Sequence, residues 1–140
     1  LKTLTGAQLN EAEYYMFADQ DDVWFPDKIE KLVAAMRMEE QSEREETPLL
    51  IHSDCRVTDQ NLQTIAPSFT AYMGYNQTMK SLPHLLVQNN VVGASVLFNR
   101  ALRNRIHSVP QSAVMHDHWI ALVAAVFVAM MTLSRISLSA

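Results

Sequence analysis

The sequence has few cysteines and few glycines: one cysteine, Cys55, and three glycines among 140 residues. A disulfide needs two cysteines, so none can form within the chain, and no Cys-x-x-Cys pair exists to bind zinc. A reducing compartment is therefore expected. A basic stripe with interleaved aromatics is missing as well, and the formal net charge is −4, so we predict no nucleic-acid partner.

Long hydrophobic runs are also scarce, although 49% of the residues are hydrophobic and can supply a core. The most apolar segment, residues 119–133, is shorter than the roughly 20 residues that a membrane-spanning helix needs. We therefore predict a buried helix there. Residues 1–10 lack the basic start and apolar core of a signal peptide, which predicts a cytoplasmic location.

Three carboxylates stand within four residues in the sequence Asp-Gln-Asp-Asp at residues 19–22, which we call the acidic segment. It follows an apolar run, residues 14–18, that predicts a short buried strand. Carboxylates this close repel one another unless a cation or several donors compensate. Ligands of open α/β sheets bind at the carboxyl ends of strands, and Mg²⁺ is held by one or two carboxylates plus phosphates. The residues therefore predict a hard-metal site that holds a phosphorylated ligand.

The acidic segment is also compatible with other functions. A calcium loop of the EF-hand kind is excluded, because Val23 and Trp24 occupy positions that such a loop gives to ligands and glycine. A metal-dependent phosphohydrolase, with water as the nucleophile, stays open. So does a catalytically inactive fragment or interaction module.

A helix is predicted from Pro26 onward, since proline suits the first helical position. Its predicted buried face consists of apolar residues at helical spacing: Ile29, Leu32, Val33 and Met36. Its predicted solvated face carries the charged residues Lys28, Lys31, Arg37 and Glu40. Residues 39–46 are predicted to be a solvated helix end and loop.

The middle of the chain predicts a second buried strand at residues 49–54 and a turn at residues 59–61. Asp54 at the end of that strand either caps a loop or faces the site, and the cap is the preferred interpretation. Residues 67–77 predict an aromatic loop or short helix that packs as a lid or lines an acceptor pocket. Residues 81–87 predict a further short helix.

The last third predicts a strand at residues 91–98 that is interrupted by Gly93, Ala94 and Ser95. A glycine in a strand marks a bulge or a close approach to a ligand. A short helix is predicted at residues 100–106, and Asp117 is predicted to be the N-cap of the apolar helix.

The predicted elements together define the fold class. Apolar strands begin near Tyr14, Leu49 and Val96, and helices begin near Asp27, Arg100 and Trp119. This alternation predicts one α/β domain over residues 1–140, with a mixed sheet flanked by helices.

Three stretches resemble a known family. They are Asp-Gln-Asp-Asp-Val-Trp-Phe-Pro-Asp-Lys at 19–28, Asn-Asn-Val-Val-Gly-Ala-Ser-Val-Leu-Phe-Asn-Arg at 89–100 and His-Asp-His-Trp at 116–119. In this order they resemble family 2 glycosyltransferases of the GT-A fold, especially the rhamnosyltransferase-like members. The resemblance covers residues 14–126 and implies an inverting transferase that acts in surface polysaccharide synthesis.

The resemblance also implies roles for individual residues. Asp19, Asp21 and Asp22 would hold Mg²⁺ or Mn²⁺ against the diphosphate of a UDP- or dTDP-sugar. Asp117 would be the catalytic base that activates a hydroxyl of a saccharide or lipid-linked acceptor. The substrate-binding residues implied are Trp24, Gly93, Ala94, His116 and Trp119. A His-x-His metal pair at 116 and 118 is a weaker interpretation than positioning, since no third ligand is near in sequence.

The chain also departs from the family pattern. The strand, helix and strand that cradle the nucleotide base in the family are missing before residue 14, so we expect an N-terminally truncated domain. It would keep the metal motif at 19–22 and an acceptor-side half at 89–133, while residues 129–140 are left unassigned. An exposed sheet edge would favour self-association, and family analogy suggests a peripheral location at the inner membrane face.

Overall fold

The computed structural model describes residues 12–42, 46–75, 91–106, 116–127 and 129–139. The strands are β1 (Tyr14–Met16), β2 (Leu49–Thr58), β3 (Thr64–Ala66), β4 (Val96–Asn99) and β5 (Ala129–Ser139). The helices are α1 (Lys28–Ser42), α2 (Phe69–Tyr72), α4 (Arg100–Arg105) and α5 (His116–Phe127), and a 3₁₀ turn, η3, spans Gly93–Ser95. The predicted helix at 81–87 lies outside the described residues.

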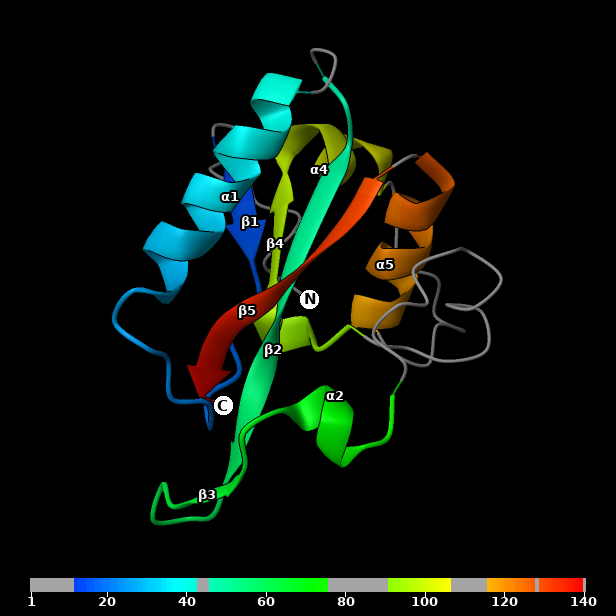
Figure 1. The fold of residues 1–140 in the computed structure, drawn as a ribbon. Helices are drawn as coiled ribbons and strands as arrows, with labels where there is room; N and C mark the ends of the chain where they lie inside the picture. Colours follow the sequence, from blue (N-terminus) through cyan, green and yellow to red (C-terminus); the bar gives the residue numbers. More distant parts are fainter. Residues whose placement is uncertain (1–11, 43–45, 76–90, 107–115, 128, 140) are drawn as a thin grey trace.

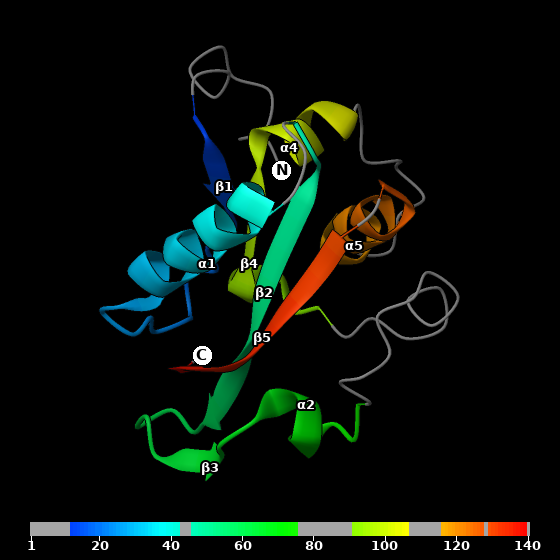
Figure 2. The same ribbon diagram turned by 45° about the horizontal axis from the view of Figure 1, so that its top comes forward.

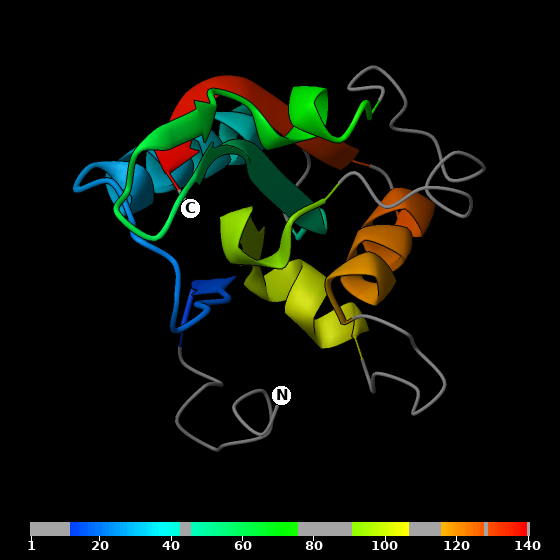
Figure 3. The ribbon, with the colours of Figure 1, turned by 90° about the horizontal axis from the view of Figure 1, so that it is seen from below.

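The described strands form one mixed sheet in the order β1-β4-β2-β3, with β5 alongside β2 (Figure 1). β4 runs antiparallel to both β1 and β2, whereas β5 runs parallel to β2. Helix α1 covers one face of the sheet and α4 and α5 cover the other (Figures 2 and 3). The predicted α/β class, with a mixed sheet flanked by helices, is confirmed at this level.

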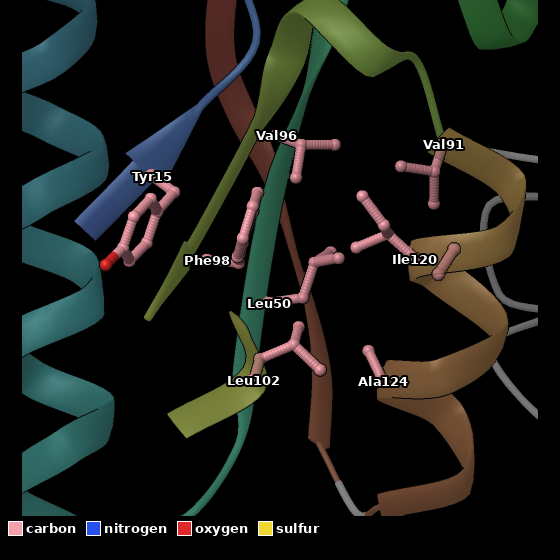
Figure 4. Packing of buried hydrophobic residues seen from close by; sticks show 9 residues of the cluster. Tyr15, Leu50, Val91, Val96, Phe98, Leu102, Ile120 and Ala124 are labelled. Atoms are coloured by element: carbon pink, nitrogen blue, oxygen red, sulfur yellow. The ribbon is translucent and has the colours of Figure 1, made fainter. Parts of the chain in front are cut away.

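Two apolar clusters lie on the two faces of the sheet. Successive side chains of a strand point to opposite faces, so Leu50 packs with Phe98 and Ile120 under α4 and α5 (Figure 4). Ile51 packs on the other face, with Leu32 of α1. The apolar run Leu49, Leu50 and Ile51 at the start of β2 therefore reflects burial on both sides.

Helix α1 begins at Lys28, two residues after the predicted start, and its buried face is rotated from the predicted one. Leu32 and Met36 are buried as predicted, but Ile29 is 52% exposed and Lys28 is only 3% exposed. The prediction that Lys28 lies on a solvated face is wrong. Lys28, Leu32 and Met36 are spaced four residues apart, so the first turn of the helix places the lysine on the same face as the core residues.

The single helix predicted over residues 119–133 is also wrong, because α5 ends at Phe127 and β5 begins at Ala129. β5 pairs with β2 from Leu49 through Ser53 and again at Cys55 and Arg56. The reason is tertiary: the second edge of β2 has backbone groups that need partners, and a short apolar run fits either a helix or a strand. No helix among the described ranges is long and apolar enough to cross a membrane.

Two smaller corrections concern the last third of the chain. Gly93, Ala94 and Ser95 form a 3₁₀ turn before β4 and not a bulge within a strand, because the Ser95 N–H bonds to the Val92 carbonyl. Helix α5 begins at His116, which places Asp117 inside the first turn and not at the predicted N-cap. A carboxylate in the first turn still complements the helix dipole.

Candidate functional site

The acidic segment lies at the end of the sheet where β1 and β2 reach their carboxyl ends. Both strands run antiparallel to β4, with Met16 opposite Leu97 and His52 opposite Val96, so β4 begins beside the end of β1, whereas β2 continues past it to Thr58. Figure 1 shows the loop after β1, together with α2 and β3, at this same end. The sequence prediction that the carboxylates follow a strand at the ligand-binding edge of the sheet is consistent with this arrangement.

A cavity of about 720 Å³ opens at this end. Its lining is mixed: it includes four acidic residues, Asp19, Asp21, Asp22 and Asp59, one basic residue, Arg56, and apolar residues such as Val57, Leu62, Phe69 and Val92. Pockets that hold small ligands typically measure about 300–1,000 Å³ and combine apolar walls with a few polar groups. We refer to it below as the acidic cavity.

The three carboxylates of the acidic segment differ in their surroundings. Asp19 and Asp21 are exposed, whereas Asp22 is half-buried. Burial raises the pKa of Asp22, the charges of Asp19 and Asp21 raise it further, and the ammonium of Lys28 opposes the shift. The segment thus has a surplus of negative charge that a cation would relieve.

Lys28 lies behind the acidic segment as a buried cation. Its Nζ donates a hydrogen bond to the Ala94 carbonyl at 2.6 Å and lies 3.9 Å from the centre of the Trp24 ring. Burial lowers the pKa of Lys28, and the negative charges of Asp22 and Asp19 are among the groups that oppose this. Lys28 was missed by the sequence interpretation, although a lysine at the first position of a helix opposes the dipole and could have signalled a special role.

Cys55 lines the acidic cavity from β2 but is itself buried. Burial raises the pKa of its thiol to about 11, although the charge of Lys28 acts in the opposite direction. Because the thiolate is the form that attacks substrates and binds metals, a thiol that stays protonated at neutral pH is unsuited to either task. Among the acidic groups that line the cavity, the carboxylates are therefore better suited than the thiol to bind a ligand.

The fit of a metal to these residues follows from their donor atoms. No group of three or more His, Cys, Asp or Glu side chains is gathered for a metal within the described residues. Mg²⁺ does not need such a cage, because it keeps several waters and takes one or two carboxylates plus the phosphates of a ligand. The oxygen donors of Asp19, Asp21 and Asp22, on one wall of an open cavity, fit this manner of binding.

The other predicted site residues fall into two groups. Trp24, Gly93 and Ala94 do not line the acidic cavity, but Lys28 contacts both the Trp24 ring and the Ala94 carbonyl in the η3 turn. His116 and Asp117 occupy the first turn of α5, a helix that packs against η3, but their side chains lie outside what the structure describes. The Trp119 Nε1 is buried and has no hydrogen-bond partner among the described residues.

Asp54 supports the wall of the acidic cavity and does not line it. Its carboxylate accepts hydrogen bonds from the Ser68 hydroxyl at 2.5 Å, the Thr70 hydroxyl at 2.9 Å and the Cys55 N–H at 2.8 Å. Ser68 is the N-cap of α2, whose Phe69 lines the cavity. The preferred interpretation of Asp54 as a residue that caps a loop therefore agrees with its contacts.

Replacing Asp54 with asparagine is expected to lower the free energy of unfolding by about 1–3 kcal/mol at neutral pH, since charge-assisted hydrogen bonds are lost. Burial opposes ionisation of Asp54, but its hydrogen bonds outweigh burial and lower its pKa. A lowered pKa stabilises the fold above the ordinary aspartate pKa and loses that effect on acidification. Urea unfolding should thus show the gap between wild type and Asp54→Asn narrowing toward pH 3, whereas exposed Glu30→Gln should stay near wild type throughout.

A second cavity, of about 540 Å³, lies at the opposite end of the sheet. It is lined by Tyr14, Glu40, Asn99 and Arg100 among others, and none of the predicted site residues contributes to it.

No protein-family model, curated protein or solved structure matches the chain.

Proposed function

We propose that the chain is the metal-binding and acceptor-side part of an inverting glycosyltransferase of the GT-A fold. It would transfer a sugar from a UDP- or dTDP-sugar to a hydroxyl of a saccharide or lipid-linked acceptor. The observation that carries the proposal is that Asp19, Asp21 and Asp22 line one open cavity at the carboxyl ends of β1 and β2. The resemblance of three ordered stretches to family 2 glycosyltransferases supplies the reaction class.

Within this proposal, the acidic segment binds Mg²⁺ or Mn²⁺ together with the diphosphate of the donor. A divalent cation bound there supplies charge stabilisation for the nucleoside diphosphate that leaves. The apolar wall, with Phe69 and Leu62, offers a surface for the less polar faces of the sugar. Trp24 and Ala94 do not line the cavity themselves, but both contact Lys28, which follows the acidic segment along the chain.

Asp117 is the proposed catalytic base. A carboxylate is ionised at neutral pH and can take the proton of an acceptor hydroxyl as that hydroxyl attacks the anomeric carbon. Attack on the face opposite the leaving diphosphate inverts the configuration of the sugar. The position of Asp117 in the first turn of α5, and the packing of α5 against η3, support a place near the cavity.

The experiment that tests the proposal is calorimetric titration of MnCl₂ with and without UDP or dTDP. The double variant Asp21→Asn/Asp22→Asn preserves side-chain size but removes two charges from the cavity. We expect it to weaken metal-dependent nucleotide binding by more than about tenfold, which corresponds to about 1.4 kcal/mol. The matched control, Asp27→Asn/Glu30→Gln, removes two charges that do not line the cavity and should bind as the wild type does.

Three outcomes of this titration separate the alternatives. Equal binding by both double variants would contradict the proposed donor site. Metal-dependent release of phosphate from a nucleotide, without any acceptor, would favour a phosphohydrolase. Binding of neither metal nor nucleotide by the wild type would leave an inactive fragment or interaction module as the better description.

A further inference from the structure

We propose that Lys28 is a positioning residue that connects the acidic segment to the η3 turn. It would hold these two segments beside the acidic cavity in a fixed position relative to each other. This inference deepens the proposed function and rests on it, because the acidic segment and η3 are the parts assigned to the donor site. Lys28 itself does not line the cavity and is 3% exposed. Its effect on a ligand must therefore pass through the residues that it contacts.

The first contact is with the loop that carries the carboxylates. The Nζ of Lys28 lies 3.9 Å from the centre of the Trp24 ring, and Trp24 follows Asp22 by two residues. A desolvated ammonium over an indole face is among the stronger cation–π contacts. The indole is half-buried, so the contact restrains the end of the loop where the acidic segment finishes.

The second contact is with the start of β4. The same Nζ donates to the Ala94 carbonyl at 2.6 Å, a buried hydrogen bond between positions 66 residues apart. η3 is itself held in shape, because the Ser95 N–H and hydroxyl both bond to the Val92 carbonyl, at 2.9 and 2.7 Å. Val92 lines the cavity together with the acidic segment, so Lys28 connects two parts of the chain that both contribute to the lining.

The energetics also indicate a role beyond packing. A buried ammonium is costly to desolvate, and a cation at the N-terminus of a helix is opposed by the dipole. Among the described residues, no carboxylate lies within ion-pair distance of Lys28, whereas Lys31 pairs with Asp27 at 2.6 Å. A methionine of similar length would fill the same space without these costs. The ammonium is instead stabilised by the Ala94 carbonyl, the Trp24 ring and the nearby charges of Asp22 and Asp19, so its charge connects the acidic segment with η3.

The test compares Lys28→Met with Lys28→Arg and with Lys31→Met, an exposed lysine on the same helix. Backbone amide NMR spectra of the full chain would be recorded during a MgCl₂ titration. In wild type, Mg²⁺ should shift the amides of residues 19–22 and of Gly93–Ser95 with one apparent Kd. In Lys28→Met the shifts at residues 19–22 should persist while those at Gly93–Ser95 are lost, and Lys28→Arg should restore them in part.

Persistence of the Gly93–Ser95 response in Lys28→Met, or its equal loss in Lys31→Met, would overturn the inference. A general loss of structure would not produce this selective loss.

Hydrogen exchange measured without metal tests whether Lys28 couples the two segments, and this test does not depend on the proposed function. Lys28→Met should speed exchange in residues 19–24 and 93–96 together, and acceleration in one segment alone would refute the coupling. If Mg²⁺ shifted no amide in wild type, the proposed metal site would be contradicted, and the hydrogen-exchange result alone would decide the role of Lys28.

Discussion

Alanine at Phe98 is expected to lower the free energy of unfolding by about 3–5 kcal/mol. Phe98 is fully buried in β4, where it lies opposite Tyr15 of β1 on one side and Leu50 of β2 on the other. Its ring stacks on Tyr15 with centroids 5.5 Å apart and lies 5.8 Å from Phe17. The alanine would leave a cavity where β1, β4 and β2 meet, so urea unfolding followed by circular dichroism should show a much lower midpoint.

Two control variants separate the cavity from a general sensitivity to mutation. Phe98→Leu keeps most of the apolar volume and should cost about 1.5 kcal/mol or less. Tyr72→Ala removes an aromatic ring that is 60% exposed and should change stability by no more than about 0.5 kcal/mol. If Phe98→Ala and Tyr72→Ala cost the same, the packing described for this face of the sheet would be wrong.

The elements that the sequence predicts well are those with a strong local pattern. β2 and β4 consist of apolar runs bounded by proline, turn residues or a polar cap, and short runs of this kind favour strands. The turn at residues 59–61 is confirmed, because Asp59 accepts hydrogen bonds from the Asn61 and Gln63 N–H groups. The short helix after Asn99 is confirmed as well.

The elements that the sequence predicts poorly depend on contacts between distant segments. β5 is a strand beside β2 because that edge needs hydrogen-bond partners, and no local pattern contains this information. Lys28 stands among other charges and resembles a surface residue, yet it is buried because the Ala94 carbonyl and the Trp24 ring accept it. Propensity and periodicity describe one element at a time, so they cannot anticipate such partners.

The candidate site likewise contains residues that a local sequence pattern predicts and residues that only contacts between distant segments bring together. The sequence predicts the carboxylates at 19, 21 and 22 and the small residues at 93 and 94 as site residues. In the structure Lys28 connects the two regions, because it contacts the Trp24 ring and the Ala94 carbonyl. Phe69 also lines the cavity and belongs to residues 67–77, which the sequence predicts as a lid or as the lining of an acceptor pocket, whereas Asp59 is predicted only as part of a turn. The residues that would bind a ligand can thus be identified from the sequence, whereas the residues that hold them in place can be identified only from the fold.

Asn99 provides the second large expected effect. It is 5% exposed, and its Oδ1 accepts hydrogen bonds from the Leu49 and Leu102 N–H groups, both at 3.0 Å. Its Nδ2 donates to the Thr47 carbonyl at 2.9 Å and to Glu40 at 3.3 Å. One side chain therefore starts β2, caps α4 and contacts the end of α1. Asn99→Ala should cost about 2–4 kcal/mol in urea unfolding, because buried backbone groups lose their partners and a helix cap is lost.

Asn99→Asp tests the same contacts with an almost isosteric side chain. It keeps the acceptor for Leu49 and Leu102 but places a second carboxylate oxygen against the Thr47 carbonyl and Glu40. Burial and like charge disfavour an ionised aspartate there, so the variant should be clearly less stable than wild type at pH 7. A carboxyl whose folded pKa is raised destabilises above its ordinary pKa, and the penalty disappears as protonation proceeds. The stability gap to wild type should therefore shrink as the pH falls from 7 toward about 4, near the ordinary aspartate pKa. A gap that is absent at pH 7, or that widens on acidification, would contradict the hydrogen-bond assignment of Asn99.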